Sequence, residues 1–139
     1  MKALILAAGM GTRLMPLTAR IPKALVQVNG VTLLELAIQK LARHGFNEII
    51  VNVHHHALQI MDFLNHFYYP DTYISISDES DELLDTGGAI MKAKWFLDGP
   101  EPFLVHNVDV ISNIDLQNLY SFHRKNQCLA TISVMERQT

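Results

Sequence analysis

Cysteine is almost absent from this sequence of 139 residues, in which Cys128 is the single one. A lone cysteine excludes an internal disulfide and is typical of a reducing compartment. No apolar run approaches the ~20 residues that cross a bilayer. The short apolar segment at the N-terminus is broken by Gly9 too early for a signal peptide. We therefore expect a cytoplasmic protein with no membrane partner.

An excess of charge of one sign is also lacking. The formal net charge is −3, which provides no basic surface for nucleic acid or another polyanion. Internal repeats, linkers and low-complexity segments are missing as well. The length and a hydrophobic content of 49% fit one domain, residues 1–139, with a sizeable core. We expect this domain to have no nucleic-acid partner.

Two common glycine motifs of nucleotide-binding proteins are incomplete here. A Rossmann fingerprint would place a third glycine where Leu14 stands. It would also need an acidic ribose ligand about twenty residues further on, whereas the first acidic residue, Glu35, falls inside a predicted helix. A Walker A loop ends in Gly-Lys-Ser or Gly-Lys-Thr, and the sequence contains neither triplet. Neither motif therefore explains the N-terminal glycines.

The N-terminal segment nevertheless carries the components of a phosphate site. An apolar strand at residues 3–6 runs into a turn with Gly9 and Gly11, where exposed backbone N–H groups attract anions. Arg13 adds a planar, permanently charged group that suits phosphate oxygens, and Lys23 adds a compact second charge. The simpler alternative is a turn that ends a strand and happens to contain an arginine.

Strand and helix patterns alternate along the rest of the chain, which predicts strand–helix–strand units and a mostly parallel sheet. Thr32 and Glu35 have the form of a capping box before an amphipathic helix that Gly45 ends. We expect a doubly wound α/β fold that binds ligands at the carboxyl ends of its strands. The predicted strands are 3–6, 26–28, 48–53, 72–77, 102–106 and 129–135, and the later helices are 57–68, 89–97 and 116–125.

Two segments after predicted strands are candidate ligand sites. Asp109 follows strand 102–106, and a single carboxylate at such a strand end suits Mg²⁺, which also takes waters and substrate phosphates. Gly87 and Gly88 precede a helix, where free N–H groups and open space suit a flat ring. The alternatives are a turn or capping aspartate and an ordinary helix start.

Three consecutive histidines, residues 54–56, suggest a metal site, but adjacent residues of a strand point in alternating directions. They are therefore poor candidates for a common ion. Asn52 and His54 share a face toward the ligand edge, and with Asn107 they are candidates for a sugar pocket. The acidic stretch 78–82 reads as a solvated loop, in which Glu79 is a candidate nucleotide or sugar contact.

One run of residues is more specific than any of these signals. Leu-Ala-Ala-Gly-Met-Gly-Thr-Arg-Leu-Met-Pro-Leu-Thr, followed by Pro-Lys-Ala-Leu, lies within residues 3–28. This run resembles the signature of the sugar-1-phosphate nucleotidyltransferases. It is most similar to the branch with the N-acetylmuramate-1-phosphate uridylyltransferases and the mannose-1-phosphate guanylyltransferases. The resemblance continues through residues 85–88 and 106–110.

The resemblance implies transfer of a nucleotidyl group from a nucleoside triphosphate, with UTP or GTP favoured, to a sugar 1-phosphate. Arg13 would hold the leaving pyrophosphate, Lys23 the α-phosphate or the sugar phosphate, and Asp109 a Mg²⁺ ion; Val108 replaces the glycine often found there. The sugar phosphate is already ionised near pH 7, so catalysis reduces to positioning and charge neutralisation. The implied nucleotide-binding residues are Ala7, Ala8, Gly9, Gly11, Thr12, Arg13, Gly87 and Gly88.

Catalytic domains of this family are longer than this chain, and a second metal-binding aspartate comes from their later part. We therefore expect the nucleotide-binding half of such an enzyme, with homo-oligomerisation possible. Two alternatives remain open. One is a nucleotide-binding module without turnover, and the other is a cytidylyltransferase that acts on a small alcohol phosphate.

Overall fold

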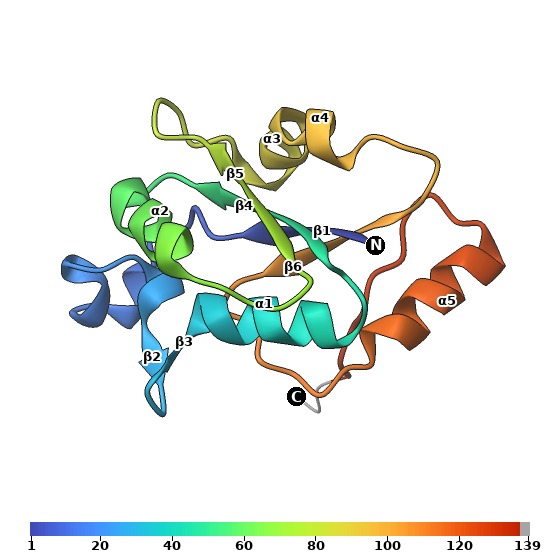
Figure 1. Cartoon of the computed structure of the whole chain (residues 1–139), viewed down its shortest axis with the longest axis horizontal. Coiled ribbons are helices and arrows are strands. Elements are labelled where there is room, and N and C mark those ends of the chain that lie inside the picture. Colours follow the sequence, from blue (N-terminus) through green and yellow to red (C-terminus); the bar gives the residue numbers. More distant parts are fainter. Residues whose placement is uncertain (137–139) are drawn as a thin grey trace.

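The computed structural model describes residues 1–136 and contains a four-stranded parallel sheet in the order β5-β4-β1-β6 (Figure 1). The apolar strand β1 is a central strand of the sheet, and its residues Ala3, Leu4 and Ile5 are fully buried, as an uninterrupted apolar run predicts. The strands are β1 (Lys2–Leu6), β4 (Glu48–Val53), β5 (Tyr73–Asp78) and β6 (Phe103–Asn107).

Helices cover both faces of this sheet, which confirms the doubly wound α/β prediction. One face carries α1 (Leu33–Arg43), α2 (Ala57–His66) and α5 (Leu116–Asn126), and the other carries α3 (Asp85–Lys92) and α4 (Lys94–Leu97) (Figure 1). None of the helices within residues 1–136 is long and apolar enough to cross a membrane.

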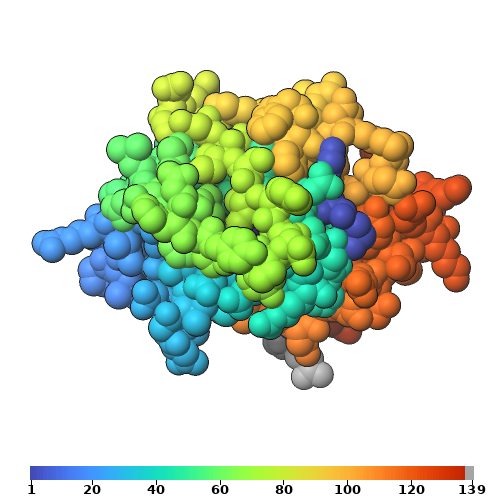
Figure 2. Space-filling model, in the orientation of Figure 1, coloured from blue at the N-terminus to red at the C-terminus, as the bar shows by residue number. Residues whose placement is uncertain are grey.

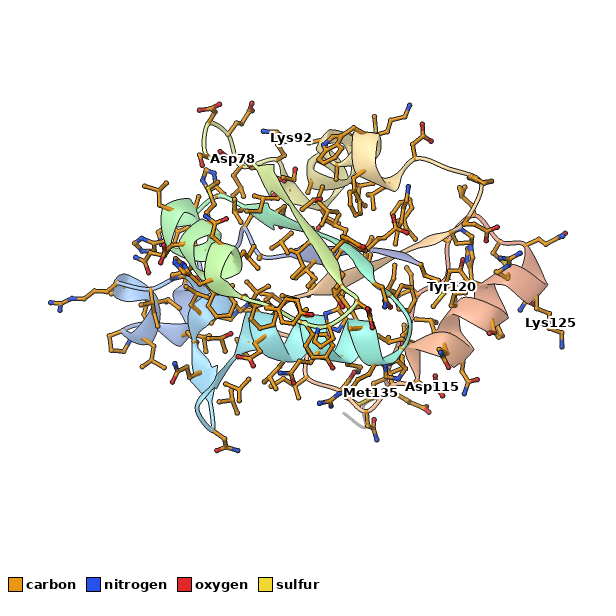
Figure 3. The ribbon with its side chains drawn as sticks, in the orientation of Figure 1. Asp78, Lys92, Asp115, Tyr120, Lys125 and Met135 are labelled. Carbon is orange, nitrogen blue, oxygen red and sulfur yellow. The ribbon has the colours of Figure 1, made fainter. Side chains whose placement is uncertain are left out.

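The larger core lies on the face of α1 and α5. Leu34, Ile38 and Leu41 of α1 are fully buried there, as the predicted helical stripe requires. Burial of each such side chain stabilises the fold by about 1.5–3 kcal/mol. Phe46 packs edge-on against Tyr120 of α5, with ring centroids 5.8 Å apart; Figure 3 labels Tyr120 on this helix.

The predicted start of α1 is confirmed, because the Thr32 hydroxyl accepts a hydrogen bond from the Glu35 N–H at 3.1 Å. The predicted short strand before Asn29 and Gly30 is also present. It forms the two-stranded hairpin of β2 (Gln27–Val28) and β3 (Val31–Thr32). Both turn residues have positive φ, 51° and 81°, which is the conformation this residue pair favours.

Two predicted boundaries are wrong. The helix predicted over 89–97 begins earlier, at Asp85, and breaks at Ala93 into α3 and α4. The helix predicted to end at residue 68 ends at His66. Three short 3₁₀ helices that were not predicted follow β1, namely η1 (Thr12–Leu14), η2 (Leu17–Ala19) and η3 (Lys23–Leu25).

The strand predicted over 129–135 is also wrong, because these residues form no strand and their larger apolar side chains are exposed. Topology excludes the simplest way to add a parallel strand here. The β1–α1–β4 and β4–α2–β5 connections move across the sheet in one direction with helices on one face. A parallel strand beyond β6, reached through α5 on that same face, would need a crossover of the opposite, left-handed kind, which sheets almost never contain.

Candidate functional site

The carboxyl ends of the parallel strands meet at one edge of the sheet, where Leu6 of β1 lies opposite Asn52 of β4 and Asn107 of β6. The chain leaves β1 at this level through the buried residues 7 and 8 and reaches Gly9, which is exposed. A methyl group on Gly9 would meet no atom within 4 Å. The main chain therefore borders open space, and a ligand can approach it closely.

Gly11 shapes the turn that follows. Its φ is 67°, and a Cβ atom would lie 2.8 Å from Thr18 Cγ2 and 3.0 Å from Lys23 Cβ. The buried Thr18 hydroxyl donates a hydrogen bond to the Gly11 carbonyl at 2.7 Å. Both the backbone conformation and the close packing therefore require glycine. The result is that η1, with Thr12 and Arg13, lies beside the segment that carries Lys23.

Lys23 and Asp109 form an ion pair at this edge. Lys23 begins η3 and its Nζ donates to Oδ2 of Asp109, 86 residues further along the chain. The two side chains are 21% and 38% exposed. A pair that is this open can exchange one of its contacts for a ligand. Figure 2 shows the η1–η3 segment in blue beside the green α2, at the side of the molecule opposite the orange α5.

Asp109 titrates below the ordinary range of aspartate. Partial burial acts to raise the pKa of Asp109, but the hydrogen bond and charge of Lys23 outweigh it, with smaller help from the Asp109 N–H and the charge of Arg13. The carboxylate is therefore ionised at neutral pH. Arg13 itself is exposed. Of the three predicted catalytic residues, Lys23 and Asp109 are in contact, and Arg13 acts on Asp109 through its charge.

The turn after β6 accommodates Val108 without strain. Its N–H donates to the Leu6 carbonyl at 3.1 Å, and its side chain is buried in the larger core. Val108 does not have a positive φ, so a valine is tolerated where the resemblance suggests glycine. The Val110 N–H donates to the Asn107 carbonyl at 3.2 Å and closes the turn. Asp109 is held between these two bonds.

Gly87 and Gly88 lie in the first turn of α3 and have different surroundings. A Cβ atom on Gly88 would lie 2.6 Å from the Leu84 Cβ, whereas one on Gly87 would meet nothing within 4 Å. Gly88 therefore permits packing within the protein, and Gly87 borders open space as Gly9 does. Asp85 begins this helix with a φ of 54°, a conformation that aspartate tolerates better than most residues.

The three predicted sugar-binding residues are not equally accessible. Asn52 is 3% exposed, and both atoms of its amide are engaged: Oδ1 accepts from the Ala7 N–H at 2.7 Å, and Nδ2 donates to Glu79 Oε1 at 3.1 Å. His54 is half-buried and its Nδ1 lies 2.6 Å from the Glu79 carbonyl oxygen. Asn107 is exposed. A sugar contact by Asn52 would require these buried bonds to break.

Glu79 differs most from its predicted environment. It belongs to the acidic stretch that reads as a solvated loop, yet it is fully buried. Its neighbour Asp78 is exposed, and hydrogen bonds from the Ser80 side chain and N–H lower the pKa of Asp78, with a smaller effect of Lys92. Figure 3 labels Asp78 and Lys92 at the same end of the molecule. The signal for this burial is the position of Glu79, which directly follows β5 at the level where β4 ends.

Two of the three consecutive histidines pack against one another. The rings of His55 and His56 lie 4.1 Å apart between centroids. Burial, followed by the charges of His56 and His54, lowers the pKa of His55. Among residues 1–136, no group of three or more His, Cys, Asp or Glu residues is arranged to hold a metal ion.

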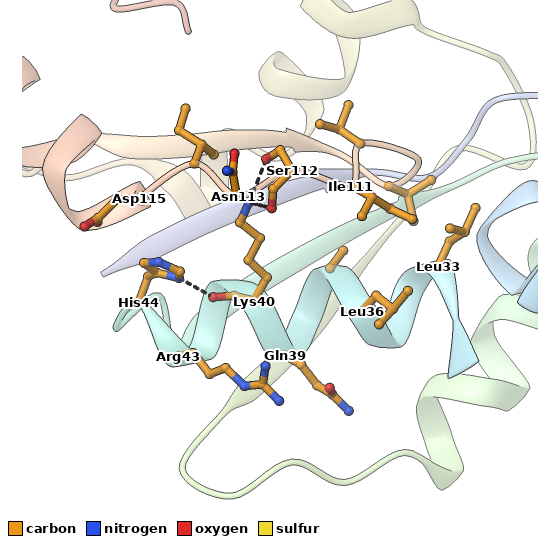
Figure 4. A pocket seen from close by; sticks show the side chains of 14 residues that line it. Leu33, Leu36, Gln39, Lys40, Arg43, His44, Ile111, Ser112, Asn113 and Asp115 are labelled. Carbon is orange, nitrogen blue, oxygen red and sulfur yellow. Dashed lines mark hydrogen bonds between the residues drawn. The ribbon is translucent and has the colours of Figure 1, made fainter. Parts of the chain in front are cut away.

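A hollow of about 500 Å³ lies behind the site, between α1 and residues 108–115 (Figure 4). It is largely apolar, and Lys40 reaches across it to donate to the carbonyl oxygen and the hydroxyl of Ser112, both at 2.7 Å. Burial lowers the pKa of Lys40. The nearby buried His106 has its pKa lowered by burial and then by Lys40. Lys23 and Asp109 do not line this hollow, although Val108 and Val110, the chain neighbours of Asp109, do.

The fold and this edge define an α/β protein with a candidate anion site at its strand ends. A glycine turn, two cationic side chains and one carboxylate converge there, an arrangement that suits the phosphates of a nucleotide. The chain belongs to the nucleotidyl transferase family, whose model matches residues 2–139.

Curated relatives agree with this family. The chain is 42% identical to the N-acetylmuramate alpha-1-phosphate uridylyltransferase of Neisseria meningitidis, over 83% of this chain and 49% of that protein. It is 35% identical to mannose-1-phosphate guanylyltransferase 1 of Arabidopsis thaliana, over 96% of this chain and 38% of that protein. The chain thus spans half or less of the length of these relatives.

A solved structure shares the fold as well. The structure of HddC from Yersinia pseudotuberculosis, complexed with GMP-PN, superposes with a TM-score of 0.77 at 29% identity. The superposition covers 88% of this chain and 53% of that one. The resemblance inferred from the N-terminal run of residues is therefore confirmed.

Proposed function

We propose that this chain provides the nucleotide-binding part of a sugar-1-phosphate nucleotidyltransferase. The observation that carries the proposal is the Lys23–Asp109 pair at the carboxyl edge of the sheet, on which the charge of Arg13 also acts. Lys23 and Asp109 come from distant parts of the chain, and an exposed pair of this kind contributes little to stability, so stability alone does not explain it. A triphosphate supplies the negative charge that the two cations would neutralise.

The nucleotide lies in this proposal across the main chain of residues 7–9, with its base between that segment and Gly87. Gly9 and Gly87 both border open space, which leaves room for a flat ring. GTP and UTP are the favoured triphosphates. The names of the relatives support them, since one is a guanylyltransferase and the other a uridylyltransferase.

The proposed reaction is a substitution at the α-phosphorus. An oxygen of the sugar 1-phosphate forms a bond to this phosphorus, and the bond from the phosphorus to the oxygen that bridges the α- and β-phosphates breaks. Pyrophosphate leaves with that bond's electron pair. Arg13 would bind the leaving group and Lys23 the α-phosphate, so both act by position and charge. No strong general base is needed, because the attacking oxygen is already ionised.

Asp109 fits the requirements of a Mg²⁺ ligand. It is a carboxylate held ionised by its surroundings and 38% exposed at the strand edge. Mg²⁺ commonly takes one or two carboxylates and completes its shell with phosphate oxygens and water. Such an ion would neutralise charge on the phosphates. Lys23 would then transfer its contact from Asp109 to a phosphate oxygen.

The experiment that tests the proposal compares binding of GTP or UTP with binding of the matching nucleoside by calorimetry. Arg13→Ala should weaken triphosphate binding by about 10- to 100-fold, as expected for lost charge-assisted hydrogen bonds. Nucleoside binding should change little. Arg20→Ala is the matched control, because Arg20 is also exposed in the same segment but is not among the charges that act on Asp109.

Equal weakening of triphosphate and nucleoside by Arg13→Ala would contradict the phosphate assignment. So would equal effects of Arg13→Ala and Arg20→Ala, since the effect would then be one of net charge rather than of position.

A further inference from the structure

Glu79 is a fully buried acid that the proposed chemistry does not use. Its Oε1 accepts one hydrogen bond, from Asn52 Nδ2, while Oε2 is buried without a hydrogen-bond partner. The ion pairs found within residues 1–136 do not include Glu79. Burial of such a group is unfavourable, so its retention at this position calls for a reason.

The orientation of the Asn52 amide gives that reason. The Ala7 N–H can only donate, so the amide must present its oxygen to Ala7, at 2.7 Å. The NH₂ group of Asn52 then necessarily faces Glu79 and needs an acceptor there. A carboxylate offers only acceptors when ionised, and it therefore fixes which way the amide lies. The bonds form a directed chain from Ala7 through Asn52 to Glu79.

Glu79 is itself fixed by its main chain. Its N–H donates to the Val53 carbonyl at 2.8 Å, and its carbonyl oxygen lies 2.6 Å from His54 Nδ1. The carboxylate thus extends from an anchored backbone, and it can hold the Asn52 amide in one place. Asn52 in turn holds the first peptide after β1, where the chain turns toward Gly9.

We propose that Glu79 is a positioning residue that fixes, through Asn52, the Ala7 peptide and with it the 7–9 main chain against which the nucleotide lies. This inference rests on the proposed function. It assigns the buried acid a role in presenting the phosphate loop, although the acid touches no substrate. It also explains why Asn52, which the sequence places at the ligand edge, has no free polar atom.

An exchange of the two side-chain types tests the chain of bonds. Asn52→Asp still offers an oxygen to the Ala7 N–H but sets two carboxylates against each other. Adding Glu79→Gln restores a donor–acceptor pair, because the introduced amide can donate to the introduced carboxylate. Asn47→Asp is the control, since it adds the same charge at the amino end of β4, where Asn47 bonds the Asp71 carbonyl.

GTP and UTP binding, measured by calorimetry at neutral pH, should fall by about 10-fold or more in Asn52→Asp. The double variant should recover to within about 3-fold of wild type, and Asn47→Asp should stay within the same range. A double variant that binds as weakly as Asn52→Asp overturns the proposal. If Asn52→Asp does not fold, the double variant decides: recovered folding and binding support the chain of bonds, and no recovery overturns it.

The Ala7 amide resonance separates this inference from the proposed function. Its ¹H shift in the free protein reports the bond to Asn52 whether or not nucleotide binds. It should move in Asn52→Asp and return in the double variant. An unmoved Ala7 resonance overturns the positioning role. If the variants show this Ala7 response but the wild-type protein binds neither triphosphate, the proposed function alone is contradicted.

Discussion

Two polar contacts at the carboxyl edge of the sheet have opposite characters. The Lys23–Asp109 pair is charged, partly exposed and connects a loop after β1 with the turn after β6. The Asn52–Glu79 contact is buried and connects the ends of β4 and β5. An open pair can exchange a partner for a ligand, whereas a closed contact cannot. The difference separates polar residues that are open to a ligand from polar residues that are already fully engaged within the protein.

The largest expected effect is on stability. Asn52→Ala would leave both the Ala7 N–H and Glu79 buried without partners, so the free energy of unfolding should fall by about 3 kcal/mol or more. Lys23→Ala removes one partner of a partly exposed pair and should change the free energy of unfolding by less than ~1 kcal/mol. Urea denaturation of both variants measures this contrast. Equal losses would remove the distinction between the two contacts.

Sequence reasoning identified Lys23 and Asp109 as site residues but missed the buried contact between Asn52 and Glu79. Arg13 and Lys23 follow from residue chemistry and from their place after a predicted strand, and the resemblance to the family adds the role of Asp109. The burial of Glu79 does not follow, because an acidic stretch has the local composition of a loop and only the alignment of β4 with β5 places one of its members inside. The strand predicted over 129–135 failed for a related reason: apolar alternation is local, but a strand also needs a neighbour that topology permits.

The next contrast concerns the two glycines of the turn. Gly11→Ala should destabilise the protein by about 1–3 kcal/mol, because alanine is strained at a φ of 67° and would press on Thr18. Gly9→Ala should leave the melting temperature nearly unchanged, since no atom lies within 4 Å of the new methyl group. It should nevertheless weaken triphosphate binding by occupying the ligand's space. A Gly9→Ala variant that binds normally would show that the nucleotide lies elsewhere.

The smallest effect concerns pH. The pKa of Asp109 is lowered in the folded protein, so its contribution to stability is present above the ordinary aspartate value of about 3.9. That contribution is lost as the pH falls through the lowered pKa of the folded state. The stability difference between wild type and Asp109→Asn, at most ~1 kcal/mol, should therefore shrink below pH ~4. A difference that stays constant from neutral pH to below this range would contradict the assigned contact with Lys23.

The position of the triphosphate is the central claim, and amide chemical shifts test it most directly. GTP and guanosine are titrated separately into the ¹⁵N-labelled chain, and their shift changes are compared residue by residue. The account predicts that the amides of Gly9, Gly11 and Asp109 respond to GTP far more than to guanosine. A triphosphate-specific response confined to Lys40 and Ser112, at the hollow beside α1, would contradict it.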